Sequence, residues 1–170
     1  DIKLYKKVCT VSPDFWSSSW LTLLFVAVLQ IGEGSFGAVY HGSWKGKEVA
    51  IKRLANTVHA SSVNEFYREA ALCLSIRPHI NVTRTYGMCQ EPNNVSLVME
   101  WLPAGSLHAW LKDESNVMTP QLLSKLLFGI ASGMAHLASQ RIVHRDLAAR
   151  NVLLDMDMEP KISGTIWPDH

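Results

Sequence analysis

The strongest constraint on the fold of this chain is a cluster of glycines between two stretches of β-forming residues. From Val26 to Lys52 the runs "VAVLQI" and "KEVAIKRL" flank the segment "GEGSFGAVYHGSWKG". Branched and aromatic residues favour strands, and glycine-rich segments allow tight turns, so this region predicts strand, turn and strand. The N-terminal half is therefore expected to be built on a β-sheet.

The segment that follows these strands is predicted to contain one helix and then two more strands. Ser62 followed by Glu65 forms a capping box that predicts a helix through about Ser75, with Arg77-Pro78 ending it. "NVTRTYGMC" and "VSLVME" predict two further strands.

A long helix is predicted over residues 121–139. Thr119-Pro120 supplies an N-cap followed by proline at the first helical position. The apolar side chains behind it have the spacing of one helix face: Leu122, Leu123, Leu126, Leu127, Ile130, Met134 and Leu137. The sequence thus predicts an α+β protein with a β-rich N-terminal half and a helical C-terminal half.

Composition excludes some classes of partner. Of 170 residues, 48% are hydrophobic and 18% are charged, and the net charge is +1. This balance is typical of a globular protein and gives no electrostatic reason to expect nucleic acid as a partner. The three cysteines lack the spacing of a metal site, so we expect reduced thiols and a cytoplasmic location.

The run "WLTLLFVAVLQ", Trp20 to Gln30, is the one segment that suggests a membrane anchor. A spanning helix needs about 20 predominantly apolar residues, and serines dilute this run. A signal peptide is a second alternative, since lysines precede the run, but its cleavage would fall almost on the glycine cluster. A membrane-anchored receptor fragment is the last-ranked hypothesis, and no membrane span is expected in this segment.

Gly32, Gly34 and Gly37 form a G-x-G-x-x-G motif. Glycines let backbone N–H groups approach phosphate oxygens without a Cβ clash. A dinucleotide-binding motif has the same spacing but opens directly into a helix, whereas β-forming residues follow here. A glycine-rich hairpin without a ligand is the alternative.

A lysine at the end of an apolar strand needs a partner. Lys52 closes "VAIK", and an unpaired buried ammonium is costly. Glu69, in the predicted helix, is the candidate partner. A solvated lysine and a solvated glutamate are the alternative interpretation.

"HRDLAARN", His144 to Asn151, is the most specific stretch of the chain. A carboxylate at Asp146 can orient a hydroxyl and accept its proton. Five residues later, the amide oxygen of Asn151 can bind a cation.

In the order and spacing of these motifs, the chain resembles the eukaryotic protein kinase family over about 130 residues, Gly32 to Ser163. The resemblance implies a two-lobed kinase-like fold. Residues 1–19 are expected to be irregular, and residues 20–170 to form a partial kinase domain. The N-lobe would span about 20–102, and the hinge and the start of the C-lobe about 103–170.

The resemblance also implies ATP and Mg²⁺ as cofactors and a protein as substrate. Lys52, paired with Glu69, would hold the α- and β-phosphates under the glycine loop, with Asp146 as catalytic base and Asn151 as magnesium ligand. Met99 falls at the gatekeeper position. The adenine would be bound by backbone groups of Glu100 and Leu102 between the side chains of Ile31, Val39, Ala50 and Leu153.

The resemblance is closest to tyrosine kinases. Ala148 stands where serine/threonine kinases typically carry a lysine, and Arg150 would approach the transferred phosphate from another chain position. Serine/threonine specificity is the alternative.

The family pattern breaks at Gly164. Where the family continues "K-I-S-D-F-G", this chain has "KIS" and then Gly164. The missing aspartate carries the metal ion that bridges the β- and γ-phosphates, and catalysis of phosphoryl transfer depends on such charge neutralisation. We therefore expect a truncated, inactive chain. A pseudokinase-like module that binds a nucleotide or a partner is the alternative, and the oligomeric state is not predicted.

Overall fold

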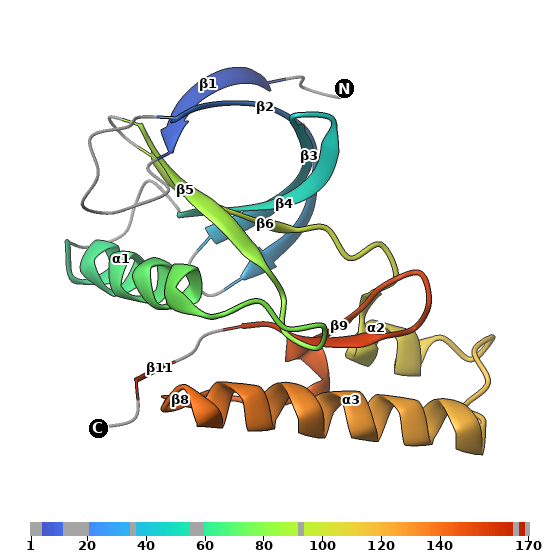
Figure 1. Ribbon diagram of the computed structural model, residues 1–170. Helices are drawn as coiled ribbons and strands as arrows, with labels where there is room; N and C mark the ends of the chain where they lie inside the picture. The colour runs from blue at the N-terminus through green and yellow to red at the C-terminus, as the bar shows by residue number, and fades with distance from the viewer. Residues whose placement is uncertain are drawn as a thin grey trace. The chain divides into compact units, whose positions relative to one another are not determined.

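A computed structural model describes residues 5–11, 21–34, 37–54, 60–91, 94–164 and 167–168 of the chain. The chain divides into two compact units. The first contains residues 1–74 and 85–101, and the second contains residues 75–84 and 102–170. Strands dominate the first unit and helices the second, so the α+β architecture expected from the sequence is present (Figure 1).

The first unit is built on one antiparallel sheet of six strands in the order β1-β2-β3-β4-β6-β5. The strands are β1 (Tyr5–Val11), β2 (Leu21–Gly34), β3 (Gly37–Trp44), β4 (Lys47–Leu54), β5 (Thr85–Glu91) and β6 (Asn94–Glu100). The sheet curls, so that its two edge strands β1 and β5 also contact each other (Figure 1). The predicted strand-turn-strand around the glycines is confirmed as β2 and β3.

The two faces of β4 belong to different parts of the core. Val49 and Ile51 are fully buried with Val98 and Cys89, and Tyr40, Trp44 and Tyr86 pack against them. On the opposite face, Leu54 packs with Val95, Leu97 and the helical residues Phe66 and Ala70. Alternation of side chains along the strands therefore places α1 (Ala60–Ser75) on a single face of the sheet.

Helix α1 ends where the sequence predicts but begins two residues earlier than the predicted N-cap. Ser62 lies inside the helix. The side chains of Ser62 and Glu65 lie outside the described part of the structure.

Two sequence expectations about the first unit are corrected, for residues 1–19 and for Cys89, and one low-ranked alternative, a membrane helix after Trp20, is not supported. Residues 1–19 are not irregular throughout, because β1 pairs with β2 along its length. The apolar run after Trp20 is the beginning of strand β2 and not a helix. Cys73 is a free thiol, whereas Cys89 takes part in a disulfide bond, so the expectation of reduced thiols is wrong for Cys89.

The second unit contains helices α2 (Leu107–Lys112) and α3 (Pro120–Ser139). Helix α3 begins as predicted, with the Oγ1 atom of Thr119 accepting a hydrogen bond from the Leu122 amide at 3.2 Å. Such an N-cap satisfies one of the free amides of the first turn.

Short strands complete the second unit. A three-stranded sheet has the order β10-β9-β7, and a two-stranded sheet pairs β11 with β8. These strands are β7 (Gly105–Ser106), β8 (Ile142–Val143), β9 (Val152–Leu154), β10 (Pro160–Ile162) and β11 (Trp167–Pro168), and a 3-10 turn spans Ala149–Asn151. Residues 75–84 join this unit because the Asn81 carbonyl accepts from the Ile162 amide and the Thr83 amide donates to the Ile162 carbonyl.

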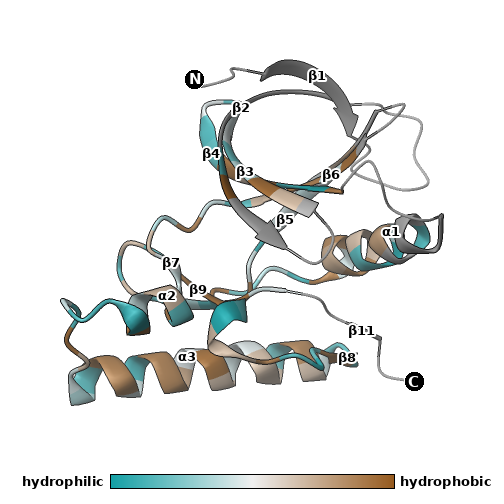
Figure 2. Cartoon of the chain, turned by 180° about the vertical axis from the view of Figure 1, so that it is seen from behind, coloured by the Kyte–Doolittle hydropathy of each residue, from teal (hydrophilic) through white to brown (hydrophobic). Residues whose placement is uncertain are grey.

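One face of α3 packs against β10, and the opposite face is apolar and exposed. Leu126 and Leu137 are buried as predicted, but Leu123 and Leu127 are 45% and 60% exposed, and Phe128 is 79% exposed. Brown, hydrophobic residues extend along much of α3 (Figure 2). Among the described residues, α3 is also the one helix whose length and composition would suffice to cross a membrane, which is weak evidence by itself.

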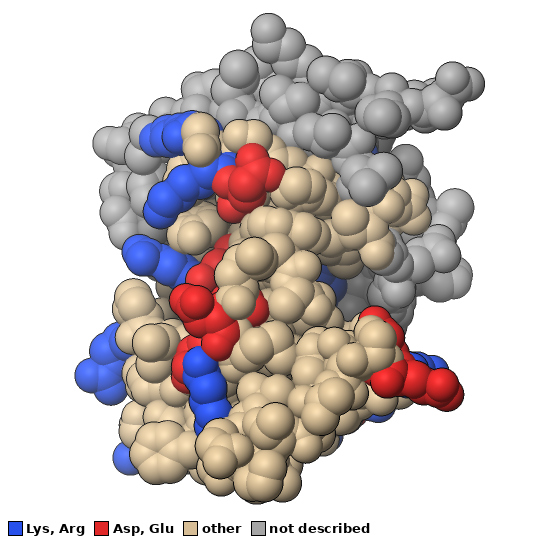
Figure 3. All heavy atoms as spheres, turned by 90° about the vertical axis from the view of Figure 1, so that its right-hand side faces the viewer, with Lys and Arg blue, Asp and Glu red and all other residues tan. Residues whose placement is uncertain are grey.

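Among the described residues on the face shown in Figure 3, acidic and basic side chains lie next to one another, and uncharged residues cover much of the rest. This intermixing agrees with the net charge of +1.

Candidate active site

The glycine motif lies at the end of the β2–β3 hairpin. Gly32 pairs with Val39, and Gly34 pairs with Gly37. Residues 35 and 36, at the tip of the predicted phosphate-binding loop, lie outside the described residues. The pairing of these residues therefore forms the turn between two strands that was expected around the glycines.

The register also brings most of the predicted nucleotide-binding side chains of the first unit onto one face. Val39 lies opposite Lys52, and Ala50 lies opposite Met99. Directly opposed residues in an antiparallel sheet project to the same side. Met99 packs on the cluster that includes α1, so this is the face that α1 covers in part.

Lys52 and Glu69 form the predicted ion pair. The Nζ atom of Lys52 lies 2.6 Å from Oε1 of Glu69, with 17% and 7% of the two side chains exposed. Lys52 also lies 6.0 Å from the centre of the Phe66 ring. A buried carboxylate without a partner is costly, so this pair fixes the lysine relative to α1.

The same pair affects Cys73 one helical turn after Glu69. Burial and the Glu69 carboxylate raise the pKa of the Cys73 thiol to about 12. The thiolate is the reactive form of cysteine. Cys73 is therefore a poor nucleophile and is not part of the candidate site.

In the second unit, Asp146, Arg150 and Asn151 form one cluster. Arg150 Nη2 lies 2.5 Å from Asp146 Oδ1, and both side chains are more than half exposed. Asn151 Nδ2 donates to Asp146 Oδ2 and to the Asp146 carbonyl, each at 2.8 Å. An exposed carboxylate oriented by two donors is suited to accept a proton from a hydroxyl.

His144 orients this cluster, a role that was not predicted from the sequence. It is 1% exposed, its Nδ1 accepts from the Asp146 amide at 3.3 Å, and its Nε2 lies 2.7 Å from the Ser163 carbonyl. Since Nδ1 accepts, Nε2 carries the proton and donates to Ser163. The position of His144 within "HRDLAARN", the most specific motif of the chain, is the signal from which this role could have been predicted.

Between these two residues, Arg145 adopts a left-handed backbone with φ 59°. This conformation is uncommon for residues other than glycine and is often found at functional sites. It reverses the chain direction locally, so that His144 points into the core while Asp146 is exposed.

Gly164 lies against Asn151. The Ser163 amide donates to the Asn151 carbonyl at 2.8 Å, and a Cβ atom built on Gly164 would lie 3.1 Å from Asn151 Oδ1 and 2.9 Å from Cγ. The φ angle of Gly164 is 103°, which L side chains rarely adopt. Gly164, which stands where the family resemblance implies an aspartate, therefore faces Asn151, the predicted magnesium ligand.

These residues do not fit Mg²⁺ as they stand. Magnesium is bound in proteins mainly by carboxylate oxygens in octahedral geometry. Here Asn151 supplies one neutral oxygen, and the carboxylate of Asp146 is engaged by Arg150 and Asn151.

The remaining predicted site residues fall in both units. Ile31 lies in β2 and is 41% exposed. Glu100 ends β6, opposite Val49 of β4. In the second unit, Leu102 is 4% exposed, and Leu153 lies in β9 opposite Lys161 of β10.

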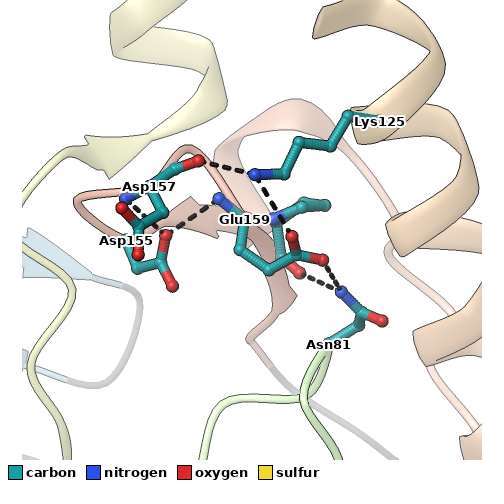
Figure 4. Close-up of polar contacts among 6 residues, drawn as sticks. Asn81, Lys125, Asp155, Asp157 and Glu159 are labelled. Carbon is teal, nitrogen blue, oxygen red and sulfur yellow. Dashed lines mark hydrogen bonds and ion pairs between the residues drawn. The ribbon is translucent and has the colours of Figure 1, made fainter.

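A polar network fixes the β9–β10 hairpin that leads to Ser163 and Gly164. Asn81 Nδ2 donates to Glu159 Oε1 at 2.7 Å and to the Pro160 carbonyl at 3.0 Å (Figure 4). Lys125 of α3 donates to the Asp157 carbonyl at 2.6 Å and lies 3.4 Å from Glu159 Oε2. Asp155 Oδ1 accepts from the amides of Asp157 and Glu159, which closes the turn.

Comparison with known proteins identifies the family. A profile of the protein tyrosine and serine/threonine kinase family matches residues 25–165. The chain belongs to this family, and its fold is the α+β two-lobed fold of protein kinases.

The most similar curated proteins include kinases of both specificities. The chain is 35% identical over 138 residues to the "probable serine/threonine-protein kinase drkA" of Dictyostelium discoideum, which covers 79% of this chain and 21% of that protein. It is 34% identical over 135 residues to the human "cytoplasmic tyrosine-protein kinase BMX", covering 79% of this chain and 20% of that protein. The chain thus spans about a fifth of the length of these relatives. It is a protein kinase domain by family, and the family generally uses ATP and Mg²⁺ to phosphorylate proteins.

Proposed function

We propose that this domain binds ATP and that its polar groups are arranged for transfer of the γ-phosphoryl group to a protein hydroxyl, that of tyrosine. The observation that carries the proposal is the cluster of Asp146, Arg150 and Asn151. It places one exposed carboxylate against a guanidinium and an amide, as a base that acts on a hydroxyl beside a phosphate requires.

Each residue takes the role that the family resemblance implies. Lys52, held by Glu69, neutralises charge on the α- and β-phosphates, and the backbone of Gly32, Gly34 and Gly37 covers them. Adenine lies among Ile31, Val39, Ala50, Met99 and Leu153, and its edge meets backbone groups of Glu100 and Leu102. Asp146 accepts the proton of the substrate hydroxyl, and Arg150 approaches the transferred phosphoryl group. Residues 20–170 form this kinase region.

With glycine at position 164, the chain is proposed to bind ATP without catalysing efficient transfer. Phosphoryl transfer depends on neutralising the charge of the phosphates, and each 1.4 kcal/mol of lost transition-state stabilisation slows a reaction about tenfold. The Mg²⁺ donors described above are insufficient for this task. The second candidate function is therefore a pseudokinase-like module that binds a nucleotide or a protein partner. The left-handed backbone of Gly164 favours this second function, because L side chains such as aspartate rarely adopt that conformation.

The test is thermal unfolding with ATP, with and without Mg²⁺, for the unaltered chain, Gly164→Asp and Gly164→Ala. Both substitutions strain the same backbone, but only the first adds a carboxylate beside Asn151. We expect ATP to stabilise the unaltered chain equally with and without Mg²⁺, and Gly164→Asp alone to gain a magnesium-dependent increment. Strong magnesium-dependent stabilisation of the unaltered chain would contradict the proposal, as would the absence of any ATP effect.

Tyrosine specificity is proposed from Ala148 and Arg150. The Gly164→Asp variant, mixed with ATP, Mg²⁺ and matched peptides, should phosphorylate tyrosine in preference to serine. Adding the double substitution Ala148→Lys, Arg150→Ala to this variant should reduce that preference. If the Gly164→Asp variant alone prefers the serine peptide, tyrosine specificity is contradicted and the serine/threonine specificity in the name of drkA is favoured.

A cytoplasmic location is proposed, because the similar human protein BMX is named a cytoplasmic tyrosine-protein kinase. The Cys89 disulfide is the observation that opposes it, because disulfides are rare in reducing compartments. Quenching cells in acid, alkylating the free thiols of the denatured protein and analysing peptides by mass spectrometry decides the matter. Cytoplasmic protein should carry the label on Cys89, and an unlabelled, disulfide-linked Cys89 would overturn the proposed location.

A further inference from the structure

We propose that His41 is a positioning residue for the nucleotide base. Its imidazole holds the indole ring of Trp101, and thereby the main chain next to Glu100, one of the two residues whose backbone groups are expected to bind the adenine edge. The inference rests on the proposed function and deepens it, because it names a further residue on which nucleotide affinity depends.

The two rings form a stack within the first unit. The centroids of the His41 and Trp101 rings lie 4.2 Å apart with an angle of 27° between their planes. Both side chains are half-buried. Aromatic contacts of this kind stabilise beyond the area that they bury, and planar rings lose little entropy when they are fixed.

The strand register places His41 in the row of residues predicted to contact adenine. His41 lies opposite Ala50 on β4, and Ala50 lies opposite Met99 on β6. Opposed residues project to the same side of the sheet, so the three side chains share a face. This is also the face of Val39 and Lys52, one row further along the strands.

Trp101 needs such a contact because the sheet ends before it. The β4–β6 pairing runs from Arg53 opposite Ser96 to Val49 opposite Glu100, and Trp101 follows β6. Beyond the last pair, the ladder of hydrogen bonds to β4 no longer fixes the backbone. The stack on His41 connects this segment to β3, two strands away in the sheet.

Glu48, on the neighbouring strand, contacts the imidazole. Its Oε2 atom lies 2.5 Å from His41 Nε2 without forming a hydrogen bond. This contact limits the positions open to the ring on that side. His41 therefore touches β4 at its edge and stacks with Trp101 through its ring face.

A stack that merely stabilises the fold would predict a different result from one that positions the base. Loss of a stabilising contact lowers the unfolding temperature but leaves the affinity of the folded chain unchanged. Loss of a positioning contact weakens nucleotide binding by the folded chain, and a flat ring at position 41 should restore it.

The experiment measures the dissociation constant of ATP without magnesium by calorimetry, beside the unfolding temperature of each protein. The variants are His41→Ala, His41→Phe and, as matched control, Ser43→Ala, which lies two residues along β3 on the same face and outside the stack. We expect His41→Ala to weaken ATP binding about three- to tenfold, the range that one aromatic contact supports. His41→Phe and Ser43→Ala should stay within about twofold of the unaltered chain, the change expected where the stacking contact is kept.

Each outcome of this experiment either supports or overturns the positioning role of His41. Affinity unchanged in His41→Ala, with or without a lower unfolding temperature, overturns the positioning role and leaves the proposed function intact. Equal weakening by His41→Phe and His41→Ala overturns the stack as the cause. If the unaltered chain binds no ATP, the proposed function fails, and the role of His41 fails with it.

Discussion

At the scale of single residues, the sequence predicted pairs better than it predicted backbone conformation. Lys52 and Glu69 were paired from their order in the chain, because a lysine closing an apolar strand needs a carboxylate. The buried position of His144 and the left-handed Arg145 were not predicted, since neither has a composition or periodicity signal. The motifs indicated which side chains belong to the candidate site, whereas the backbone that orients them is seen only in the structure.

The Lys52–Glu69 pair gives a prediction about stability. Lys52→Met leaves the Glu69 carboxylate without its ion-pair partner at 7% exposure, and breaking a buried pair typically costs about 3 to 5 kcal/mol. The double variant Lys52→Met, Glu69→Leu should recover much of this loss, because no charge is then left without its partner. Urea denaturation of the single and double variants measures the coupling. Equal stability of Lys52→Met and the double variant would show that the two groups do not interact.

At the scale of elements, helix α3 shows which signals in the sequence were sufficient. Thr119 and Pro120 fixed its start because capping chemistry is local. Its packing was not predicted, although two glycines four residues apart indicated a close approach. A Cβ atom on Gly129 would lie 2.5 Å from Pro160 Cγ, and one on Gly133 would overlap the Asn81 carbonyl oxygen.

The second prediction follows from this contact. Gly133→Ala should destabilise the second unit by about 1 to 3 kcal/mol, the usual cost of overpacking, even though alanine favours a helix. Ala135→Ser on the exposed side of the same helix is the control and should stay within about 0.5 kcal/mol of the unaltered chain. Thermal unfolding followed by circular dichroism measures both. Stabilisation by Gly133→Ala would show that α3 and residues 75–84 are not in close contact.

The contact between residues 75–84 and α3 is also predicted to weaken in acid. The His79 and His136 rings stack with centroids 4.4 Å apart, His79 Nδ1 accepts from the Asn81 amide, and the Arg77 carbonyl lies 2.8 Å from His136 Nε2. Partial burial, then His136 and Lys161, lower the pKa of His79 below its usual 6.5.

Because the unfolded chain then takes up the proton at a higher pH than the folded chain, the stabilisation is complete above pH 6.5 and is lost as the pH falls below it. His79→Phe should remove this part of the pH dependence of the unfolding free energy. His108→Phe, on an exposed position of α2, should leave it unchanged. A pH profile of His79→Phe that matches the unaltered chain would refute the assignment.

At the scale of the whole molecule, the order of motifs predicted the fold class. The division into two compact units depends on long-range contacts that the motifs do not show. The boundary after Trp101 lies beside the expected hinge, but residues 75–84 belong to the second unit although α1 and β5 on either side belong to the first. Their membership depends on backbone hydrogen bonds to Ile162, about 80 residues away, and no local pattern encodes such contacts. The apolar residues of α3 also cover more of the helix surface than the one face that is buried.

That breadth leads to the last prediction, which concerns association of the chain with itself. Leu123, Leu127 and Phe128 are 45%, 60% and 79% exposed on one side of α3, and contiguous exposed apolar surface promotes association. We expect the chain to self-associate with increasing concentration in sedimentation velocity experiments. Leu127→Gln with Phe128→Lys should reduce association without lowering the unfolding temperature, since neither side chain supports the core. The control Ile80→Gln changes another exposed apolar residue, outside α3, and should leave association unchanged. A monomeric unaltered chain at high concentration would show that this face does not drive association.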